Sequence, residues 1–324
     1  MIKTKVTEML ECKYPIIVGT MANITNPEFV AACSNAGSCA VLASANYKTP
    51  DELREAIRKT KSLTNKPFAV NINLFPALMS QDKLEDYVEV TLEEGAKIIE
   101  TSGHKAPEHL VPKFKDGGAI WIHKCAGVKY AIKGASLGAD LITVVGYENG
   151  GATGILDIGT LVMVPSVVDA LDIPIIAGGG VSDGRGVAAI LALGAEGVIM
   201  GTRMMATKEC PIHDNLKQAL VQASETDTSL VMRSIRNTHR VWRNKAAEKI
   251  IELESKKASL EEIVQVASGQ NALKMYRDGD LDVGMVSCGQ GVGIVKDIPT
   301  VKELLDRIIK ETEQVIQKLG NISN

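Results

Sequence analysis

Short apolar runs alternate with segments of helical periodicity along the first two thirds of the chain. Each run is bounded by glycine or polar residues and is too short for a helix, which predicts buried parallel strands joined by crossover helices. Eight strands are the number that closes a (β/α)8 TIM barrel. They are expected at residues 15–19, 39–43, 67–72, 97–101, 119–123, 140–145, 173–177 and 197–200.

Three segments carry clear helix signals. Apolar residues recur at i, i+3, i+4 and i+7 from Val128 to Ala135, which predicts an amphipathic helix. Pro50 follows Thr49 at a position that suits the first turn of a helix. Thr300 and Glu303 have the spacing of a capping box, so a final helix is expected to begin there. Its apolar stripe should pack on the barrel: Val301, Leu304, Leu305, Ile308, Val315 and Ile316.

The strand and helix alternation stops after Cys210-Pro211. Residues 212–285 carry many charges and helical spacing without a convincing strand, so they predict a small helical insertion or cap. Residues 1–211 and 286–324 would then form one α/β barrel. A barrel of this kind commonly takes about 250 residues, which leaves room for such an appendage in a chain of 324 residues.

Composition narrows the class of protein. Hydrophobic residues make up 45% of the chain, the net charge is −3, the pI is about 6.0 and the mean hydropathy is +0.06, so nothing favours binding to nucleic acid or a membrane. Glu8 and Glu11 interrupt any signal-peptide pattern at the N-terminus, and a cytoplasmic location is expected. The six cysteines lack CxxC pairs and metal-ligand spacing, which predicts reduced thiols and no metal site.

Two glycine turns predict a phosphate site. Gly178, Gly179 and Gly180 follow one predicted strand, and Gly201 with Thr202 follows the next. Adjacent turns at the carboxyl ends of neighbouring strands direct main-chain amides and helix N-termini to one point, as in phosphate sites of barrels. A Rossmann dinucleotide turn would instead need an acidic residue at the end of the next strand, where the chain has Met200-Gly201-Thr202. Glycines that serve only tight turns are a third interpretation.

Motifs along nearly the whole chain carry a family resemblance. They are YPIIVGTMA at 14–22, KPFAVNINLFP at 66–76, IHKCAGVKYAIKGASLGAD at 122–140, the two glycine turns, KECPIH at 208–213 and VMRSIRN at 231–237. With them the chain resembles the nitronate monooxygenases, formerly called 2-nitropropane dioxygenases, the related NADH:quinone reductases and the flavin-dependent enoyl-ACP reductases. The KECPIH and MRSIRN segments resemble the first two groups more than the third.

The resemblance implies FMN in a barrel, with these residues around it. Gly19 and Met21 would lie beside the flavin ring, and Asn71 would hydrogen-bond the ring or ribityl chain. Lys124 would face the pyrimidine or ribityl oxygens, where a cation stabilises the reduced anionic flavin. The phosphate would lie on Gly178, Gly179, Gly180, Gly201 and Thr202. Three alternatives stay open: Asn71 binds the loop backbone, Asn73 takes its ligand contact, or Lys124 is a solvated surface lysine. His123 is expected to point away from the ligand.

The loop at 146–154 departs from the family pattern. Relatives usually carry a catalytic histidine after its small residues, whereas this chain has Ala152. Tyr147, Glu148 and Thr153 are the nearest replacements, and losing a general base typically costs about two to four powers of ten in rate. Gly150 and Gly151 would keep the backbone close to the flavin. The resemblance also implies a substrate pocket formed by Ala152, Thr153, Ser287 and Gln290.

These features favour an FMN-dependent oxidoreductase that oxidises alkyl nitronates with dioxygen. An alternative enzyme would use NAD(P)H to reduce quinones or enoyl thioesters. A flavin-binding protein with little catalysis is a hypothesis from another class, suggested by Ala152, and a sugar-phosphate barrel without flavin is a fourth. The expected partner is a small-molecule substrate, and pairing into a homodimer stays open.

Overall fold

A computed structural model describes residues 2–74, 81–103 and 105–322. Phe75 and Pro76, the last residues of the motif at 66–76, lie outside this range. Eight parallel strands form a closed barrel in the order β1-β2-β3-β4-β5-β6-β8-β9, and β1 pairs with β9 to complete the ring. This confirms the predicted TIM barrel. The strands are β1 (Ile16–Val18), β2 (Cys39–Ala43), β3 (Phe68–Asn73), β4 (Ile98–Ser102), β5 (Ile120–Cys125), β6 (Leu141–Val145), β8 (Ile175–Gly178) and β9 (Gly197–Met200).

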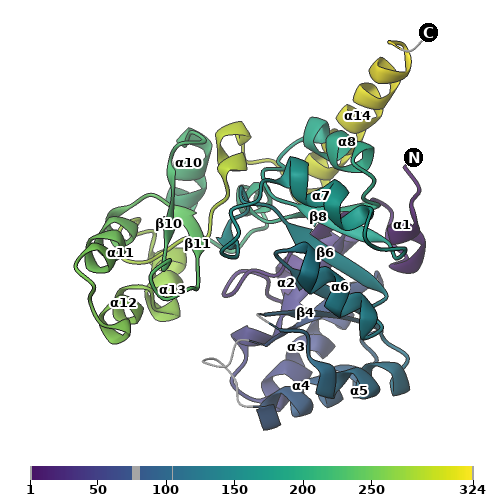
Figure 1. The fold of residues 1–324 in the computed structure, drawn as a ribbon, viewed down its shortest axis with the longest axis horizontal. Coiled ribbons are helices and arrows are strands. Elements are labelled where there is room, and N and C mark those ends of the chain that lie inside the picture. The colour runs from purple at the N-terminus through teal and green to yellow at the C-terminus, as the bar shows by residue number, and fades with distance from the viewer. Residues whose placement is uncertain (1, 75–80, 104, 323–324) are drawn as a thin grey trace.

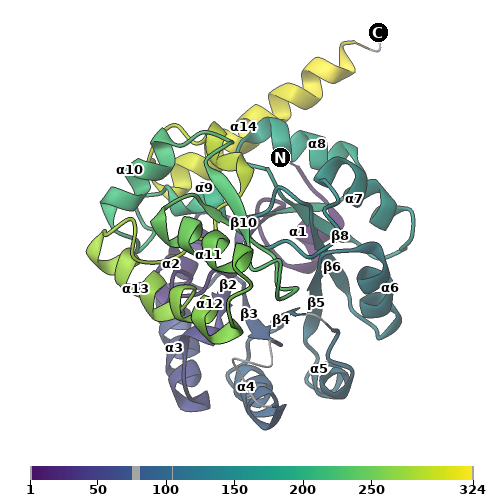
Figure 2. The same ribbon diagram turned by 60° about the vertical axis from the view of Figure 1, so that its left-hand side comes forward.

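Helices surround the barrel (Figure 2). Their N-terminal signals act as the sequence predicts: the Thr49 side chain accepts a hydrogen bond from the Glu52 amide, and Thr300 forms a capping box with Glu303. The helices are α1 (Lys5–Met9), α2 (Pro27–Asn35), α3 (Pro50–Leu63), α4 (Gln81–Glu93), α5 (Val111–Asp116), α6 (Val128–Ser136), α7 (Thr160–Val168), α8 (Gly184–Ala192), α9 (Thr202–Met205) and α14 (Val301–Gly320), with 3-10 turns η1 (Ser44–Asn46), η2 (Glu108–Leu110) and η3 (Gln290–Ile294).

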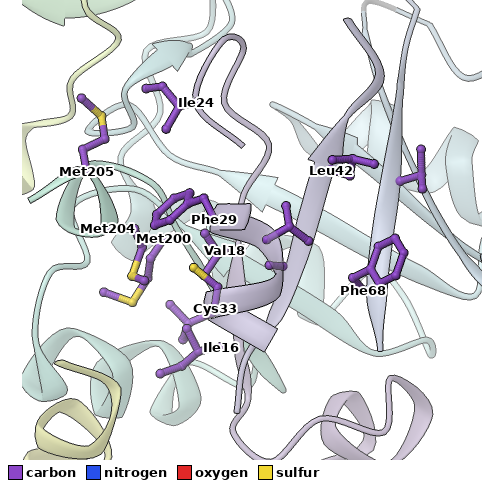
Figure 3. Packing of buried hydrophobic residues seen from close by; sticks show 14 of the residues in the cluster. Ile16, Val18, Ile24, Phe29, Cys33, Leu42, Phe68, Met200, Met204 and Met205 are labelled. Carbon is purple, nitrogen blue, oxygen red and sulfur yellow. The ribbon is translucent and has the colours of Figure 1, made fainter. Parts of the chain in front are cut away.

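Alternate strand residues form two hydrophobic layers. One set points outward, and Figure 3 shows Phe29 and Cys33 of α2 beside Ile16 and Val18 of β1. The other set fills the barrel interior, where Ile17 and its counterparts cluster with Val6 and Leu10 from the N-terminal segment. That segment therefore covers the amino end of the barrel and leaves the carboxyl end for a ligand.

The final helix packs on the barrel with only part of its predicted stripe. Val301, Leu304, Leu305 and Ile308 are buried, but Ile316 is 46% exposed. Figure 1 shows the reason, because the C-terminal part of α14 projects beyond the body of the protein. The prediction that Ile316 packs on the barrel was wrong.

The segment at 212–285 forms a cap beside the carboxyl end of the barrel (Figure 1), and it is not purely helical. Two antiparallel strands cross it, and the second pairs with a two-residue strand of the loop after β6. The expectation of no strand was wrong because these strands are short and contain polar residues. The elements are α10 (Asp214–Gln222), β10 (Thr228–Val231), β11 (His239–Trp242), α11 (Lys245–Ser255), α12 (Leu260–Val266) and α13 (Gly269–Asp278), and the barrel-loop strand is β7 (Gly151–Ala152).

Candidate active site

A cavity of about 670 Å³ is lined by both the barrel and the cap. Asn73, Ser102 and Lys124 line it from the ends of β3, β4 and β5, and Val264 and Met285 line it from the cap side. This volume is in the range of small-molecule sites, roughly 300–1,000 Å³. Further lining residues are Gly103, Cys125, Ala126, Tyr130, Val145, Ala152, Gly154, Ile155, Leu156, Met232, Arg236, Asn237, Thr238, His239, Ala267, Ser268 and Gly269.

The glycine turn after β8 presents main-chain amides. Gly179 and Gly180 have φ angles of +111° and +74°, and none of the described residues accepts a hydrogen bond from either amide. Successive amides in such a turn form a concave anion site. Gly178 differs, because it belongs to β8 and a Cβ there would lie 2.5 Å from the Ile199 carbonyl oxygen. Its role is close strand packing.

The turn after β9 adds to the same site. No acceptor for the Gly201 amide is found within the described ranges, and a Cβ on Gly201 would meet only Met21 Sδ, at 3.7 Å. Gly19 follows β1 and donates its amide to the Met200 carbonyl at 3.0 Å. Gly19 and Met21 therefore lie beside the turn after β9. Their predicted place beside a flavin ring stays a prediction.

The segment that returns from the cap connects the loops of the site. The Gly289 amide donates to Thr202 Oγ1 at 2.9 Å, and the Gln290 amide donates to the Glu148 carbonyl at 2.9 Å. Ser182 Oγ donates to the Gly291 carbonyl at 2.8 Å. Gln290 thus serves through its main chain. Neither Ser287 nor Gln290 belongs to the cavity lining, so the prediction that they line it is not supported.

Buried polar side chains from three neighbouring strands lie inside the barrel. Asn71 Nδ2 donates to Glu100 Oε1 at 2.7 Å and to Ser102 Oγ at 3.0 Å. Glu100 is fully buried; burial raises the pKa of its carboxyl, while the Lys124 charge and the Asn71 hydrogen bond lower it. Glu100 Oε2 and Thr143 Oγ1 have no hydrogen-bond partner among the described residues. Asn71 therefore binds neither loop backbone nor the cavity surface, and Asn73 is the asparagine that lines the cavity.

Lys124 and His123 point in opposite directions, as expected from strand alternation. Lys124 lines the cavity and is half-buried. His123 is 1% exposed and lies 3.0 Å from Thr101 Oγ1 through Nδ1. Trp121 Nε1 already donates to that hydroxyl at 2.8 Å, so the hydroxyl proton goes to His123 Nδ1. Burial lowers the pKa of His123 to about 4, which keeps the ring neutral and structural.

The loop residues considered as replacements for the missing histidine are engaged elsewhere. The Glu148 carboxylate accepts hydrogen bonds from the Thr160 amide and hydroxyl at the start of α7, the latter at 2.7 Å. The Arg240 guanidinium stacks 4.4 Å from the centre of the Tyr147 ring. Thr153 is buried and donates its amide to the Thr238 carbonyl at 3.2 Å. None of the three lines the cavity.

Gly150, in the glycine pair of this loop, lies close to the backbone of the return segment. A Cβ on Gly150 would lie 2.6 Å from the Gly289 amide nitrogen, and Gly151 has a φ angle of +80°. Both glycines are therefore required by the packing of the return segment and by the turn into β7. Their predicted contact with a flavin stays a prediction.

The cap contributes residues that the sequence did not single out as functional. Arg236 and His239 line the cavity. Arg236 lies within the VMRSIRN motif, which ends at Asn237, and His239 lies two residues after it. Met232 and Arg236 have φ angles of +59° and +57°, which are strained for residues with large side chains and are concentrated at functional sites. Arg236 is exposed, and none of the described residues pairs with its guanidinium. The motif drew attention to this segment, but it did not predict that the segment lies over the barrel and lines the cavity.

Other chemistry finds no support in the described part of the chain. All six cysteines are buried and unpaired, and no group of three or more His, Cys, Asp or Glu side chains within the described ranges could hold a metal. Burial raises the pKa of Cys125, which lines the cavity, to about 12. Among helices in residues 2–74, 81–103 and 105–322, none is long and apolar enough to span a bilayer.

The donor set fits a flavin mononucleotide. Amides of Gly179, Gly180 and Gly201 have no acceptor among the described residues and would suit a phosphate, and the Thr202 hydroxyl keeps its own proton to donate because its oxygen accepts from Gly289. Lys124 and Asn73 present a cation and an amide to the cavity, whose described lining includes none of these four turn residues.

Comparisons with known proteins agree with this geometry. The family model described as nitronate monooxygenase matches residues 3–311. A (3aS,4S,5R,7aS)-5-hydroxy-7a-methyl-1-oxo-octahydro-1H-indene-4-carboxyl-CoA dehydrogenase of Rhodococcus jostii is 32% identical, over 98% of both chains. A probable nitronate monooxygenase of Staphylococcus saprophyticus is 32% identical over 70% of this chain and 75% of its own. The solved structure of FabK from Thermotoga maritima has a TM-score of 0.90 and 34% identity, and covers 99% of this chain and 100% of that one. The chain therefore belongs to the nitronate monooxygenase family of flavin-dependent oxidoreductases.

Proposed function

We propose that this protein is an FMN-dependent oxidoreductase that transfers hydride to or from the carbon chain of an acyl thioester, with NAD(P)H as the partner in the other half-reaction. Gly179, Gly180, Gly201 and Thr202 would hold the FMN phosphate, and Lys124 would face the ring. The flavin supplies reversible two-electron chemistry. The protein supplies the closed site and the orientation of the substrate.

The apolar wall of the cavity is the observation that carries this proposal. Ile155 and Leu156 are each 43% exposed at the cavity, facing a space that Met232, Val264 and Met285 also line. Exposed apolar side chains in a concave site favour an apolar guest. A small, charged nitronate needs no such wall, whereas the acyl part of a thioester would bury it.

Arg236 supports an anionic carrier on the same substrate. Its guanidinium is exposed at the cavity and unpaired within the described residues, and guanidinium is well suited to phosphate oxygens. The Rhodococcus jostii relative, by name a carboxyl-CoA dehydrogenase, aligns with 98% of this chain, and thus with the cap as well. These observations favour a thioester of coenzyme A.

Oxidation of an alkyl nitronate is the second candidate. The family model and the Staphylococcus saprophyticus relative favour it by name. A nitronate has already lost its proton, so its oxidation needs no base at position 152. The thioester proposal and the nitronate alternative differ in both the electron donor and the electron acceptor.

An anaerobic experiment separates them. FMN-loaded protein is mixed with NADH, with NADPH and with propionate 3-nitronate, and flavin bleaching is followed; reduced protein is then mixed with crotonyl-CoA. We expect bleaching by one of the two nucleotides and reoxidation by crotonyl-CoA. Bleaching by the nitronate alone overturns the proposal. A flavin that binds but reacts with none of these would support the flavin-binding protein with little catalysis.

Arg236→Gln tests the CoA assignment. We expect KM for crotonyl-CoA to rise about tenfold, or about 1.4 kcal/mol, with little change for an enone that lacks the CoA moiety. Lys310→Gln, which removes one exposed charge from α14, is the control. Equal effects on both substrates would exclude recognition of the carrier by Arg236.

A further inference from the structure

Ala152 and His239 are directly opposed across two antiparallel strands. β7 pairs with β11, and the Cα partners are His239 with Ala152 and Arg240 with Gly151. The histidine that the family pattern places at position 152 is absent, and a histidine stands opposite that position on the neighbouring strand. The two positions are far apart in the sequence and adjacent in the sheet.

Directly opposed residues in an antiparallel pair point to the same side of the sheet. Their Cβ atoms are about 4.5–5.5 Å apart, so imidazoles on these two residues would be neighbours on one face of the sheet. Ala152 and His239 also line the same cavity, together with Lys124 from the barrel. The imidazole of His239 therefore reaches the space that a histidine at 152 would reach.

The hydrogen bond between His239 Nδ1 and the Asn237 carbonyl fixes the tautomer of the ring. Nδ1 lies 2.8 Å from the Asn237 carbonyl oxygen. A carbonyl can only accept, so Nδ1 carries the proton and Nε2 is the basic nitrogen of the neutral ring. An imidazole oriented in this way by its own strand can exchange a proton through Nε2.

Other ionisable side chains also line the cavity. Among the described residues they are Lys124, Cys125, Tyr130 and Arg236. Burial raises the pKa of the Cys125 thiol to about 12. Arg240, next to His239 on β11, is held by Tyr147 and Thr228. Among side chains lining the cavity, His239 is the one whose ordinary pKa, about 6.5, suits acid and base roles at neutral pH.

We propose that His239 is the general acid and base of this enzyme and takes the place of the histidine absent at position 152. The substrate in this inference rests on the proposed function. In the reducing direction, a bound reduced flavin would supply the hydride for a new C–H bond at the β-carbon of the enoyl thioester. The C=C π electrons form the second C–H bond at the α-carbon with the Nε2 proton of the His239 imidazolium, which is left as the neutral ring with its proton on Nδ1. The thioester gains two electrons, which the flavin would supply, and the neutral imidazole regains a proton from solvent.

Replacement of the imidazole tests this role. His239→Gln and His239→Asn should slow crotonyl-CoA reduction by about 10²–10⁴-fold, the usual contribution of a general acid. Flavin bleaching by NAD(P)H should be unchanged, because that hydride transfer needs no protein acid. The rate should also lose its dependence on a group that titrates near neutral pH. His109→Gln on the exposed turn η2 is the matched control. Rates within threefold of wild type, with the same pH profile, overturn the inference.

A transplant distinguishes catalysis from structural damage. Ala152→His combined with His239→Ala returns the imidazole to the family position. We expect this double variant to reduce crotonyl-CoA at least tenfold faster than His239→Ala alone. A rate no better than that of His239→Ala contradicts the inference. A folded and flavin-loaded double variant, shown by its absorbance spectrum, excludes misfolding as the reason.

An NMR titration gives a readout independent of turnover. The imidazole signals of wild type, assigned by comparison with His239→Gln, should show Nδ1–H in the neutral form. The pKa read from them should agree with the kinetic pKa within one unit, and disagreement or the opposite tautomer overturns the inference.

Failure of the proposed function gives a different pattern. If wild type reduces no thioester but oxidises nitroethane, the thioester assignment fails, and the same variants then decide whether His239 removes the nitroethane proton. A wild-type protein inactive on both substrates overturns both proposals.

Discussion

Asn71 Nδ2 donates a hydrogen bond of 2.7 Å to Glu100 Oε1 inside the barrel, and that carboxyl has no other hydrogen-bond partner within the described residues. The charge of Lys124 on the next strand lowers the pKa of Glu100, and burial raises it by more. Glu100 lies on β4 between the strands that carry Asn71 and Lys124. The Glu100 carboxyl thus has one hydrogen bond, from Asn71, and is also influenced by the charge of Lys124.

Glu100→Gln should change how stability depends on pH. Because the folded pKa is raised, the folded protein binds more protons than the unfolded chain above about pH 4. The free energy of unfolding of wild type should therefore fall as pH rises from that value through the folded pKa. Glutamine keeps an acceptor for Asn71 and does not titrate, so the variant should lose this decline. Urea unfolding from about pH 4 to about pH 8 measures it, with the exposed Glu261→Gln as control.

His123 should destabilise the protein in acid. Its ring is neutral in the fold, with a pKa of about 4, against about 6.5 in the unfolded chain. Between these values the unfolded chain binds more protons, so stability falls as pH falls, by up to about 3 kcal/mol. His123→Gln keeps an acceptor for the Thr101 hydroxyl and should remove this dependence while lowering stability at neutral pH. Denaturant unfolding checks the difference between the two pH limits. An unchanged acid limb would contradict the assignment.

Lys124→Met should weaken the binding of reduced FMN more than the binding of oxidised FMN. A cation near the pyrimidine ring stabilises the anionic reduced form. Its loss should lower the ratio of reduced to oxidised FMN affinity about tenfold, which is about 1.4 kcal/mol. Lys124→Arg keeps the charge and should retain most of this ratio. Dye-linked redox titration of the bound flavin measures it, and equal potentials for all three proteins would place Lys124 away from the ring.

Gly201→Ala should weaken FMN binding without changing the stability of the fold. The backbone φ at Gly201 is −124° and its nearest neighbour would be Met21 Sδ at 3.7 Å, so the flavin-free protein should keep its stability within about 0.5 kcal/mol. A methyl beside the amide should weaken FMN about tenfold. Gly179→Ala is the contrast, because φ is +111° and the Cβ would lie 2.6 Å from Thr160 Oγ1. That change should destabilise the fold itself. FMN titration followed by fluorescence, with thermal unfolding, checks both.

The barrel could be predicted from sequence because its signals are local. Each barrel strand is a short apolar run. For all eight of them, the predicted first and last residues differ from the observed ones by two residues at most. The glycine turn after β8 could also be predicted, because Gly179 and Gly180 adopt positive φ angles that other residues avoid.

The cap and the cavity wall could not be predicted in the same way. β7 has two residues, and β11 carries His239 and Arg240, so neither gives a hydrophobic pattern. The pairing of Ala152 with His239 depends on tertiary register. Ser287 and Gln290 were expected to use their side chains, whereas it is the main chain of Gly289 and Gln290 that makes the contacts joining the loops.

The pairing of β7 with β11 limits how the site can open. β7 belongs to a barrel loop and β11 to the cap, and Gly289 further ties the return segment to Thr202. A hinge that swung the cap away as a rigid body would leave these main-chain groups without partners. Entry and exit of ligands should therefore follow fluctuations of loops and side chains, on nanoseconds to microseconds, rather than a slower rotation of one body against the other.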